Sequence, residues 1–97
     1  MNIKEAINKL EEYNQLFVDS FVMSKLNGTK VEINEIVIAP IDREDALSNW
    51  DEYRSKRITL DDSKSYDVYF SLEMGLSMEA PMTIEELMQE FEVHKNK

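Results

Sequence analysis

The sequence predicts a small α+β domain in which helices pack on one face of a mostly antiparallel sheet, in the order α-β-α-β-β-α. Stretches with apolar residues three and four positions apart, typical of helices, alternate with stretches of two-residue periodicity, typical of strands. The chain has 97 residues, a length typical of one domain, so we expect a single domain over 1–97. Hydrophobic residues make up 42% of it, which is enough for one core.

The N-terminal segment is predicted to be a helix that begins at Asn2. Asn2 is a good N-cap, and Glu5 three residues later completes a capping box. Apolar side chains then recur at helical spacing as far as Phe17. The favoured interpretation is a helix that continues to Leu26 and ends at the following Asn-Gly pair. The alternative is a short strand over 16–23, because its Phe and Val residues also suit a sheet.

In the middle of the chain, the sequence pattern predicts a strand followed by a helix. Residues 30–39 form the strand, which contains the β-branched run 36–38 and ends at Pro40. Asp42 is then the N-cap of a second helix, whose apolar stripe includes Leu47.

Two further strands and a helix complete the predicted order. The strands cover 57–60 and 66–74 and are joined by a polar hairpin turn. The second of them has the clearest apolar-polar alternation in the chain. A loop is expected over 75–82, and Thr83 with Glu86 then forms a capping box for the last helix.

One core is expected to collect the inward-facing side chains of these elements, because each amphipathic face must be buried against another. The periodicity selects residues from every predicted helix and from two of the three predicted strands. They are Ile3, Ile7, Leu10, Val31, Ile36, Ile38, Leu47, Trp50, Val68, Phe70, Leu72, Leu87 and Phe91.

Net charge is the most informative property of the sequence. Twenty Asp and Glu against eleven Lys and Arg give −9. Such a charge disfavours direct binding to nucleic acid or an anionic membrane, because phosphate binding requires a basic surface. It attracts basic protein surfaces and steers their association, although solubility alone is a competing explanation.

Residues typical of catalysis are scarce. The chain has no cysteine, which excludes disulfides, thiolate metal sites and a Cys nucleophile. Its one histidine, His94, is expected in a polar, frayed C-terminal tail, and two glycines cannot form a phosphate-binding loop. The acidic clusters at 42–45 and 61–67 are typical of a helix start and a turn rather than a metal site. We therefore expect a non-enzymatic protein without catalytic residue, metal or cofactor.

The expected location is the cytoplasm. The first residues lack the basic and apolar regions of a signal peptide. No apolar run approaches the ~20 residues that cross a bilayer.

Two features favour a protein partner. Carboxylates on the second and last predicted helices form arrays suited to a basic groove built for phosphates, with an ordinary solvated surface as the alternative. Methionines at four-residue intervals suit an adaptable apolar interface, with gap-filling in the core as the alternative. The predicted partner-binding residues are Glu85, Glu86, Glu90, Glu44, Asp45, Asp51, Glu52, Met74, Met78 and Met82.

In size, charge and composition, including its Lys/Glu/Asn/Ile-rich opening over 1–7, the chain resembles the small acidic accessory proteins of phages and mobile elements in low-GC bacteria. The resemblance implies an inhibitor of the anti-CRISPR or anti-restriction type, which occupies the basic groove of a nucleic-acid-processing defence enzyme. It implies no individual functional residue. The alternative function is a structural interaction module that forms a homodimer through a Met-rich apolar surface.

Overall fold

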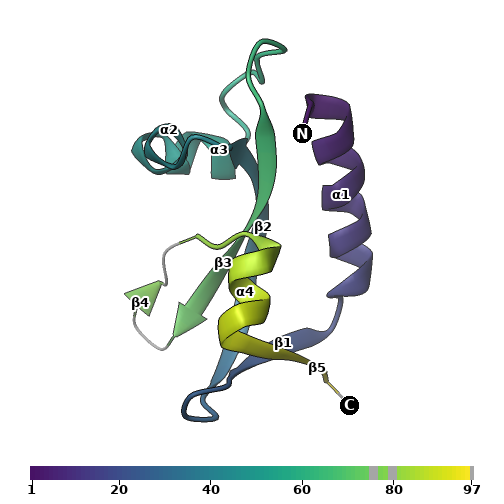
Figure 1. The fold of residues 1–97 in the computed structure, drawn as a ribbon, viewed down its shortest axis with the longest axis vertical. Coiled ribbons are helices and arrows are strands. Elements are labelled where there is room, and N and C mark those ends of the chain that lie inside the picture. Colours follow the sequence, from purple (N-terminus) through teal and green to yellow (C-terminus); the bar gives the residue numbers. More distant parts are fainter. Residues whose placement is uncertain (75–76, 79–80, 97) are drawn as a thin grey trace.

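The computed structural model describes residues 1–74, 77–78 and 81–96 and has an antiparallel sheet with helices around it (Figure 1). The elements are α1 (Ile3–Leu16), β1 (Ser20–Ser24), β2 (Lys30–Pro40), α2 (Arg43–Ser48), α3 (Trp50–Arg54), β3 (Tyr66–Met74), β4 (Ser77–Met78), α4 (Ile84–Glu90) and β5 (Phe91–Lys95). The sheet order is β4-β3-β2-β1-β5. The predicted α+β class is confirmed, although the described elements run α-β-β-α-α-β-β-α-β.

The helices cover both faces of the sheet rather than the one face predicted. Tyr69 and Phe70 are neighbours in β3, so their side chains point to opposite faces. Phe70 packs against Tyr13 and Phe17 of the α1 layer, with ring centroids 5.5 and 5.1 Å apart. Tyr69 instead meets Trp50 of α3 at 6.2 Å. Figure 1 shows α1 on one side of the long strands and α2 and α3 on the other.

The buried side chains form two clusters rather than the single core expected. One joins α2 and α3 to the central strands and the start of α1: Ala6, Val37, Ala39, Ala46, Tyr53, Tyr66 and Tyr69. The other joins the end of α1 to β1, α4 and β5: Phe17, Val22, Val31, Phe70, Leu72, Leu87 and Phe91. Two residues predicted in the core are exposed, Ile7 at 41% and Leu47 at 47%.

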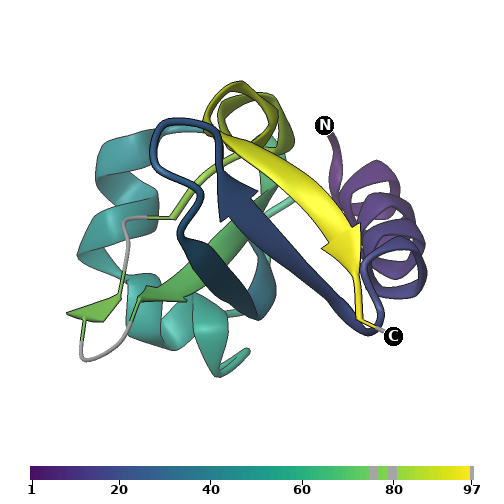
Figure 2. The same cartoon turned by 90° about the horizontal axis from the view of Figure 1, so that it is seen from below.

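The segment after α1 is a strand, so the favoured long helix is wrong and the alternative is right. α1 begins with the predicted Asn2–Glu5 capping box and ends at Leu16. Asp19 then has φ 53°, a left-handed conformation that an α-helix cannot contain. The following strand, β1, pairs with β2 on one side and with β5 on the other (Figure 2).

The predictions for the middle of the chain are mostly confirmed. β2 covers the strand predicted over 30–39, and Asp42 caps α2 by accepting hydrogen bonds from two backbone N–H groups. The helical region divides at Asn49 into α2 and α3. The strand predicted over 57–60 is wrong, because this stretch is irregular and lies outside the sheet. β3 has the predicted bounds.

The C-terminal region contains a strand where a frayed tail was predicted. α4 starts with the predicted capping box, and the chain continues directly into β5, which pairs with β1 over five residues. His94 therefore lies in the sheet, stacked on Phe21 with ring centroids 5.4 Å apart. Of the loop predicted over 75–82, residues 75–76 and 79–80 lie outside the described residues, and 77–78 form β4.

Candidate functional site

The 11-residue strand β2 is paired along most of its length on one side only. β3 pairs with it from Glu32 to Pro40, apart from an irregularity at Asn34. On the opposite side, β1 pairs only with residues 30–32. Among the described strands, none covers β2 on this side beyond Glu32. The edge over 35–39 is therefore open.

The register of β3 decides which main-chain groups face that open edge. Phe70 exchanges both of its main-chain hydrogen bonds with Met82, at N···O distances of 2.6 and 3.0 Å. The N–H of Tyr66 likewise donates to the carbonyl oxygen of Met1 at 2.7 Å. These bonds lie on the side of β3 away from β2, and successive residues of a strand alternate sides.

Ile36 and Ile38 consequently direct their main-chain groups into the open edge. They pair with Phe70 and Val68, and residues paired across an antiparallel ladder point either both toward each other or both away. Each contributes one N–H donor and one C=O acceptor. Pro40, which pairs with Tyr66, is the next residue whose main chain faces the open edge. Proline suits this position because it has no N–H that would stay unpaired there.

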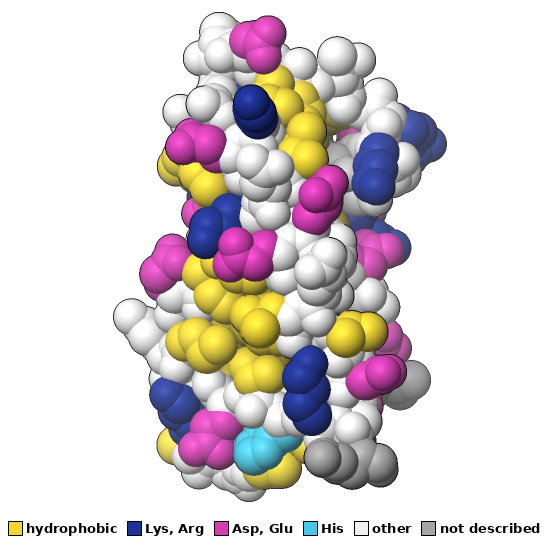
Figure 3. Space-filling model, turned by 90° about the vertical axis from the view of Figure 1, so that its right-hand side faces the viewer, with side chains coloured by type: hydrophobic (Ala, Val, Ile, Leu, Met, Phe, Trp, Pro, Cys, Tyr) yellow, Lys and Arg dark blue, Asp and Glu magenta, His cyan; other side chains and the backbone are white. Residues whose placement is uncertain are grey.

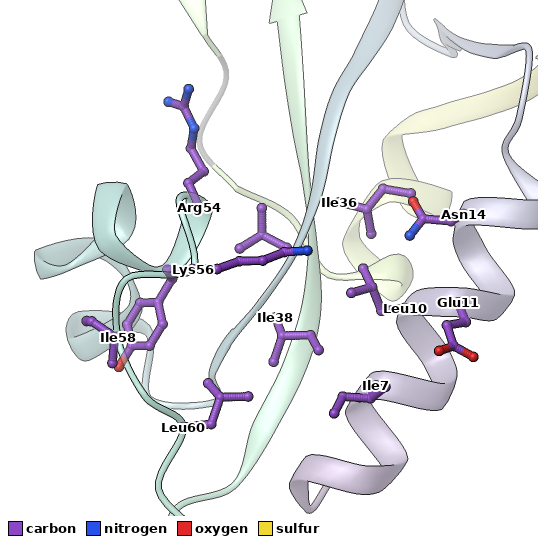
Figure 4. Close-up of a pocket in the computed structure, with 12 residues that line it drawn as sticks. Ile7, Leu10, Glu11, Asn14, Ile36, Ile38, Arg54, Lys56, Ile58 and Leu60 are labelled. Carbon is purple, nitrogen blue, oxygen red and sulfur yellow. The ribbon is translucent and has the colours of Figure 1, made fainter.

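Two walls beside this edge make a groove of ≈ 480 Å³, which we call the edge groove (Figure 4). One wall is α1, and the other is the end of α3 with the irregular segment after it; β2 forms the floor. The lining residues are Ile7, Leu10, Glu11, Asn14, Ile36, Val37, Ile38, Tyr53, Arg54, Lys56, Ile58 and Leu60.

The edge groove is apolar at one end and polar at the other. Figure 4 shows Ile7, Ile38 and Leu60 gathered toward one end. Arg54 and Asn14 lie toward the opposite end. A bound chain would therefore meet different surroundings along its length.

The two cations of the edge groove differ in their partners. Arg54 Nε lies 2.7 Å from Glu35 Oε2, and Arg54 Nη1 lies 3.8 Å from Asp51 Oδ1. Glu35 Oε2 is buried and forms no hydrogen bond with a described residue, so the ion pair with Arg54 compensates its negative charge. Lys56 has φ 61° and extends its side chain across the groove toward β2 (Figure 4). No carboxylate of the described residues lies within ion-pair distance of it.

One predicted partner-binding carboxylate, that of Glu86, holds two helices together. Glu86 Oε1 lies 2.5 Å from Arg43 Nη2, which links α4 to α2. The hydrogen bond from the backbone N–H of Thr83, and next the one from Arg43, lower the pKa of Glu86 below its ordinary value. This carboxylate already has internal partners.

The other predicted carboxylates divide between paired and unpaired. Asp45 Oδ2 lies 2.9 Å from Lys64 Nζ, and the hydrogen bond from Lys64 lowers the pKa of Asp45. Asp51 is close to Arg54, as described above. The remaining four are exposed and form no ion pair with any described residue: Glu44, Glu52, Glu85 and Glu90. On the face drawn in Figure 3, carboxylates are interspersed with Lys and Arg.

The described residues do not show the three methionines predicted to bind a partner as one common surface. Met82 is half-buried, packs against the cluster that contains Phe70, and bonds to it through the main chain. Met74 lies in β3 and Met78 in β4, and the side chains of both lie outside the described residues. Met82 therefore fills the core, and an interface at Met74 and Met78 stays a prediction.

Among the described residues, no three His, Asp or Glu side chains approach closely enough to hold a metal ion. None of the described helices has both the length and the apolar character that crossing a bilayer requires. His94 Nε2 lies 3.4 Å from Glu92 Oε1, beside the Phe21 ring.

Sequence reasoning missed the edge groove. The available signal was the run Ile36-Val37-Ile38, which is apolar on both faces of its strand, as expected where both faces are covered. No sequence pattern distinguishes the exposed Ile7, or Lys56, which forms no ion pair with any described residue. No protein-family model, curated protein or solved structure matches the chain.

Proposed function

We propose that this chain is a non-enzymatic binding protein that accepts a short extended segment of a partner protein along the open edge of β2. The observation that carries the proposal is the main chain of Ile36 and Ile38 on the floor of the edge groove, with which no strand among the described residues pairs on this side. Extended peptides bind such edges by strand addition. Their main-chain hydrogen bonds provide affinity, and pockets beside the edge select side chains.

A peptide fits the edge groove better than a small apolar molecule does. The volume of ≈ 480 Å³ is within the range of small-molecule sites, roughly 300–1,000 Å³. However, the floor presents donors and acceptors with the two-residue period of a strand. Another strand satisfies that row, whereas a compact apolar ligand displaces its water and leaves the groups unpaired.

The first experiment selects peptides from a random display library on the immobilised protein and measures their affinity by fluorescence anisotropy. N-methylation of a selected peptide, one amide at a time, should abolish binding at every second position, because only alternate amides face β2. Ile7→Ser should weaken binding about tenfold, since it removes apolar contact from the α1 wall.

The matched control is Leu26→Ser, because Leu26 is 94% exposed in the turn between β1 and β2 and does not line the groove. It should leave affinity unchanged. Binding that tolerates N-methylation at all positions, or that weakens equally with both serine variants, would rule out strand addition at β2.

A second candidate is the inhibitor implied by the sequence, which binds a basic groove of a nucleic-acid-processing enzyme through its acidic helices. The observation that favours it is the set of four exposed carboxylates without an ion pair on α2, α3 and α4 among the described residues. Reversing Glu44, Glu85 and Glu90 to Lys should then abolish binding of a basic partner, and binding should weaken steeply with salt. A triple variant that binds such a partner as the parent does would remove this candidate.

A further inference from the structure

We infer that the segment accepted by the edge groove is apolar on both of its faces and carries a carboxylate that pairs with Lys56. This inference rests on the strand-addition function proposed above and specifies the chemistry of the partner. It comes from the apolar side chains of the two walls and from the charge of Lys56, whose side chain extends across the groove.

The walls require apolar side chains on both faces of the added strand. Side chains of a strand alternate between its faces, and a strand beside β2 would lie between two layers of the fold. On the α1 side it would meet Ile7 and Leu10. On the opposite side it would meet Tyr53, Ile58 and Leu60. A strand covered on both faces is a continuous apolar run, typically rich in Val and Ile.

Lys56 supplies the charge preference. The chain carries −9 overall, yet the edge groove contains two cations and the single acid Glu11. Arg54 is compensated by Glu35, whereas Lys56 has no acidic partner among the described residues. Its ammonium group extends over an apolar groove (Figure 4), where water is partly displaced when a peptide binds. A carboxylate there gains more than at an open surface, because the local dielectric constant falls.

The occupant is a segment of another protein rather than a second copy of this chain. Two copies would bring together −9 and −9, which disfavours their association. In addition, the open edge of β2 lies between two walls in each copy, so two such edges cannot approach within strand-pairing distance of about 4.8 Å. A free or terminal extended segment meets neither obstacle.

A different role for Lys56 makes an opposite prediction. Lysines beside open strand edges prevent edge-to-edge aggregation. If that were the whole role of Lys56, its removal would cause self-association and would leave peptide preference unchanged.

The test uses fluorescein-labelled synthetic peptides with a Val-Ile-Val core between Gly-Ser flanks. One residue next to the core, at either end, is Asp, Asn or Lys. Wild-type protein should bind the better Asp peptide about fivefold more tightly than its Asn counterpart, the size expected of a partly exposed ion pair. Lys56→Met, which keeps the apolar stem, should abolish that preference, and Lys56→Glu should favour the Lys peptide. Lys4→Met, on the exposed surface of α1, is the matched control and should retain the wild-type preference.

The outcomes separate the two proposals. Equal binding of Asp and Asn peptides to wild-type protein overturns the carboxylate preference without any variant, so poor folding of Lys56→Met cannot obscure the result. If library-selected peptides bind along β2 while no Val-Ile-Val peptide binds, the apolar segment is wrong and strand addition stands. If no peptide of either kind binds, strand addition itself fails. Self-association of Lys56→Met with unchanged peptide preference assigns Lys56 to edge protection and overturns its role in recognition.

Discussion

Two residues of similar hydrophobicity, Phe70 and Leu47, have very different surroundings. Both belong to the predicted core, but Phe70 is completely buried between the rings of Tyr13 and Phe17, whereas Leu47 is 47% exposed on α2. The helix that carries Leu47 has only six residues and buries Ala46 instead. Stability therefore depends on the position of a side chain in the fold and not on its hydrophobicity alone.

Phe70→Ala should lower the free energy of unfolding by roughly 3–5 kcal/mol, because it removes a buried ring and leaves a cavity between α1 and the sheet. Leu47→Ala should change it by at most about 0.5 kcal/mol. Urea titration monitored by circular dichroism measures both. Equal losses for the two variants would contradict the assignment of Leu47 to the surface.

The ion pair of Glu86 predicts a pH dependence. The pKa of Glu86 is lowered by the hydrogen bonds from Thr83 and Arg43, so its carboxylate stabilises the fold above about pH 4.5. That contribution is lost as pH falls through the lowered pKa. Glu86→Gln keeps a side chain able to form the capping box. It should therefore be less stable than wild type at pH 7, with the difference shrinking toward pH 3.

Glu85→Gln is the control for this measurement. Glu85 lies in the same first turn of α4 but forms no ion pair with a described residue. Glu85→Gln should change the free energy of unfolding only slightly at every pH between 7 and 3. Urea titrations over this pH range measure the effect for both variants. A gap between Glu86→Gln and wild type that stays constant over this range would show that the charge of Glu86 does not stabilise the fold.

At the scale of elements, β2 combines two different edges. Val37 and Ala39 point their main-chain groups at β3, while those of Ile36 and Ile38 enter the edge groove. The same strand therefore stabilises the sheet with one set of residues, and the other set is the one that we propose pairs with a partner. β1 does not close the open edge of β2, because it pairs with β2 only over 30–32.

Amide hydrogen exchange, resolved by residue with NMR, should detect this alternation directly. In the free protein, the amides of Ile36 and Ile38 should exchange fast and those of Val37 and Ala39 slowly, because only the latter pair with β3. A bound peptide should slow Ile36 and Ile38 and leave the other two unchanged. Equal protection of all four amides in the free protein would mean that the edge is already covered.

At the scale of the whole molecule, the charge of −9 opposes the compact fold. The ion pairs at Arg43, Arg54 and Lys64 offset part of that repulsion by joining elements that are distant in sequence. Many carboxylates of the described residues form no ion pair with a described cation. On the face drawn in Figure 3, Asp and Glu side chains are spread among Lys and Arg. On this face, the repulsion between carboxylates is therefore distributed and not concentrated in one patch.

Salt should consequently stabilise the protein. Raising NaCl from ~0.01 to ~0.15 M shortens the Debye length from about 30 to about 8 Å and screens the repulsion. The free energy of unfolding in urea should rise over this range. A variant with Glu44→Gln, Glu52→Gln and Glu90→Gln should be more stable than wild type at low salt and respond less to NaCl. A free energy that falls with salt in both proteins would show that attractive ion pairs outweigh the repulsion.

Local chemistry determined a large part of this protein from sequence alone. The caps at Asn2, Asp42 and Thr83 placed the starts of α1, α2 and α4, because a side chain that accepts a backbone N–H bond acts within three residues. The alternation in β3 placed both of its ends. Composition and charge narrowed the expected function to a binding protein, which stays a proposal.

Tertiary structure decided what depends on partners distant in sequence. Residues 20–24 suit a helix or a strand locally, and hydrogen bonding to both β2 and β5 selects the strand. His94 enters the sheet for the same reason. The edge groove exists because the pairing of β1 with β2 stops at Glu32 of β2, while α1 and the segment around Lys56 lie on either side of β2. No local pattern encodes that arrangement, since it depends on which strand edge remains unpaired after the whole chain has folded.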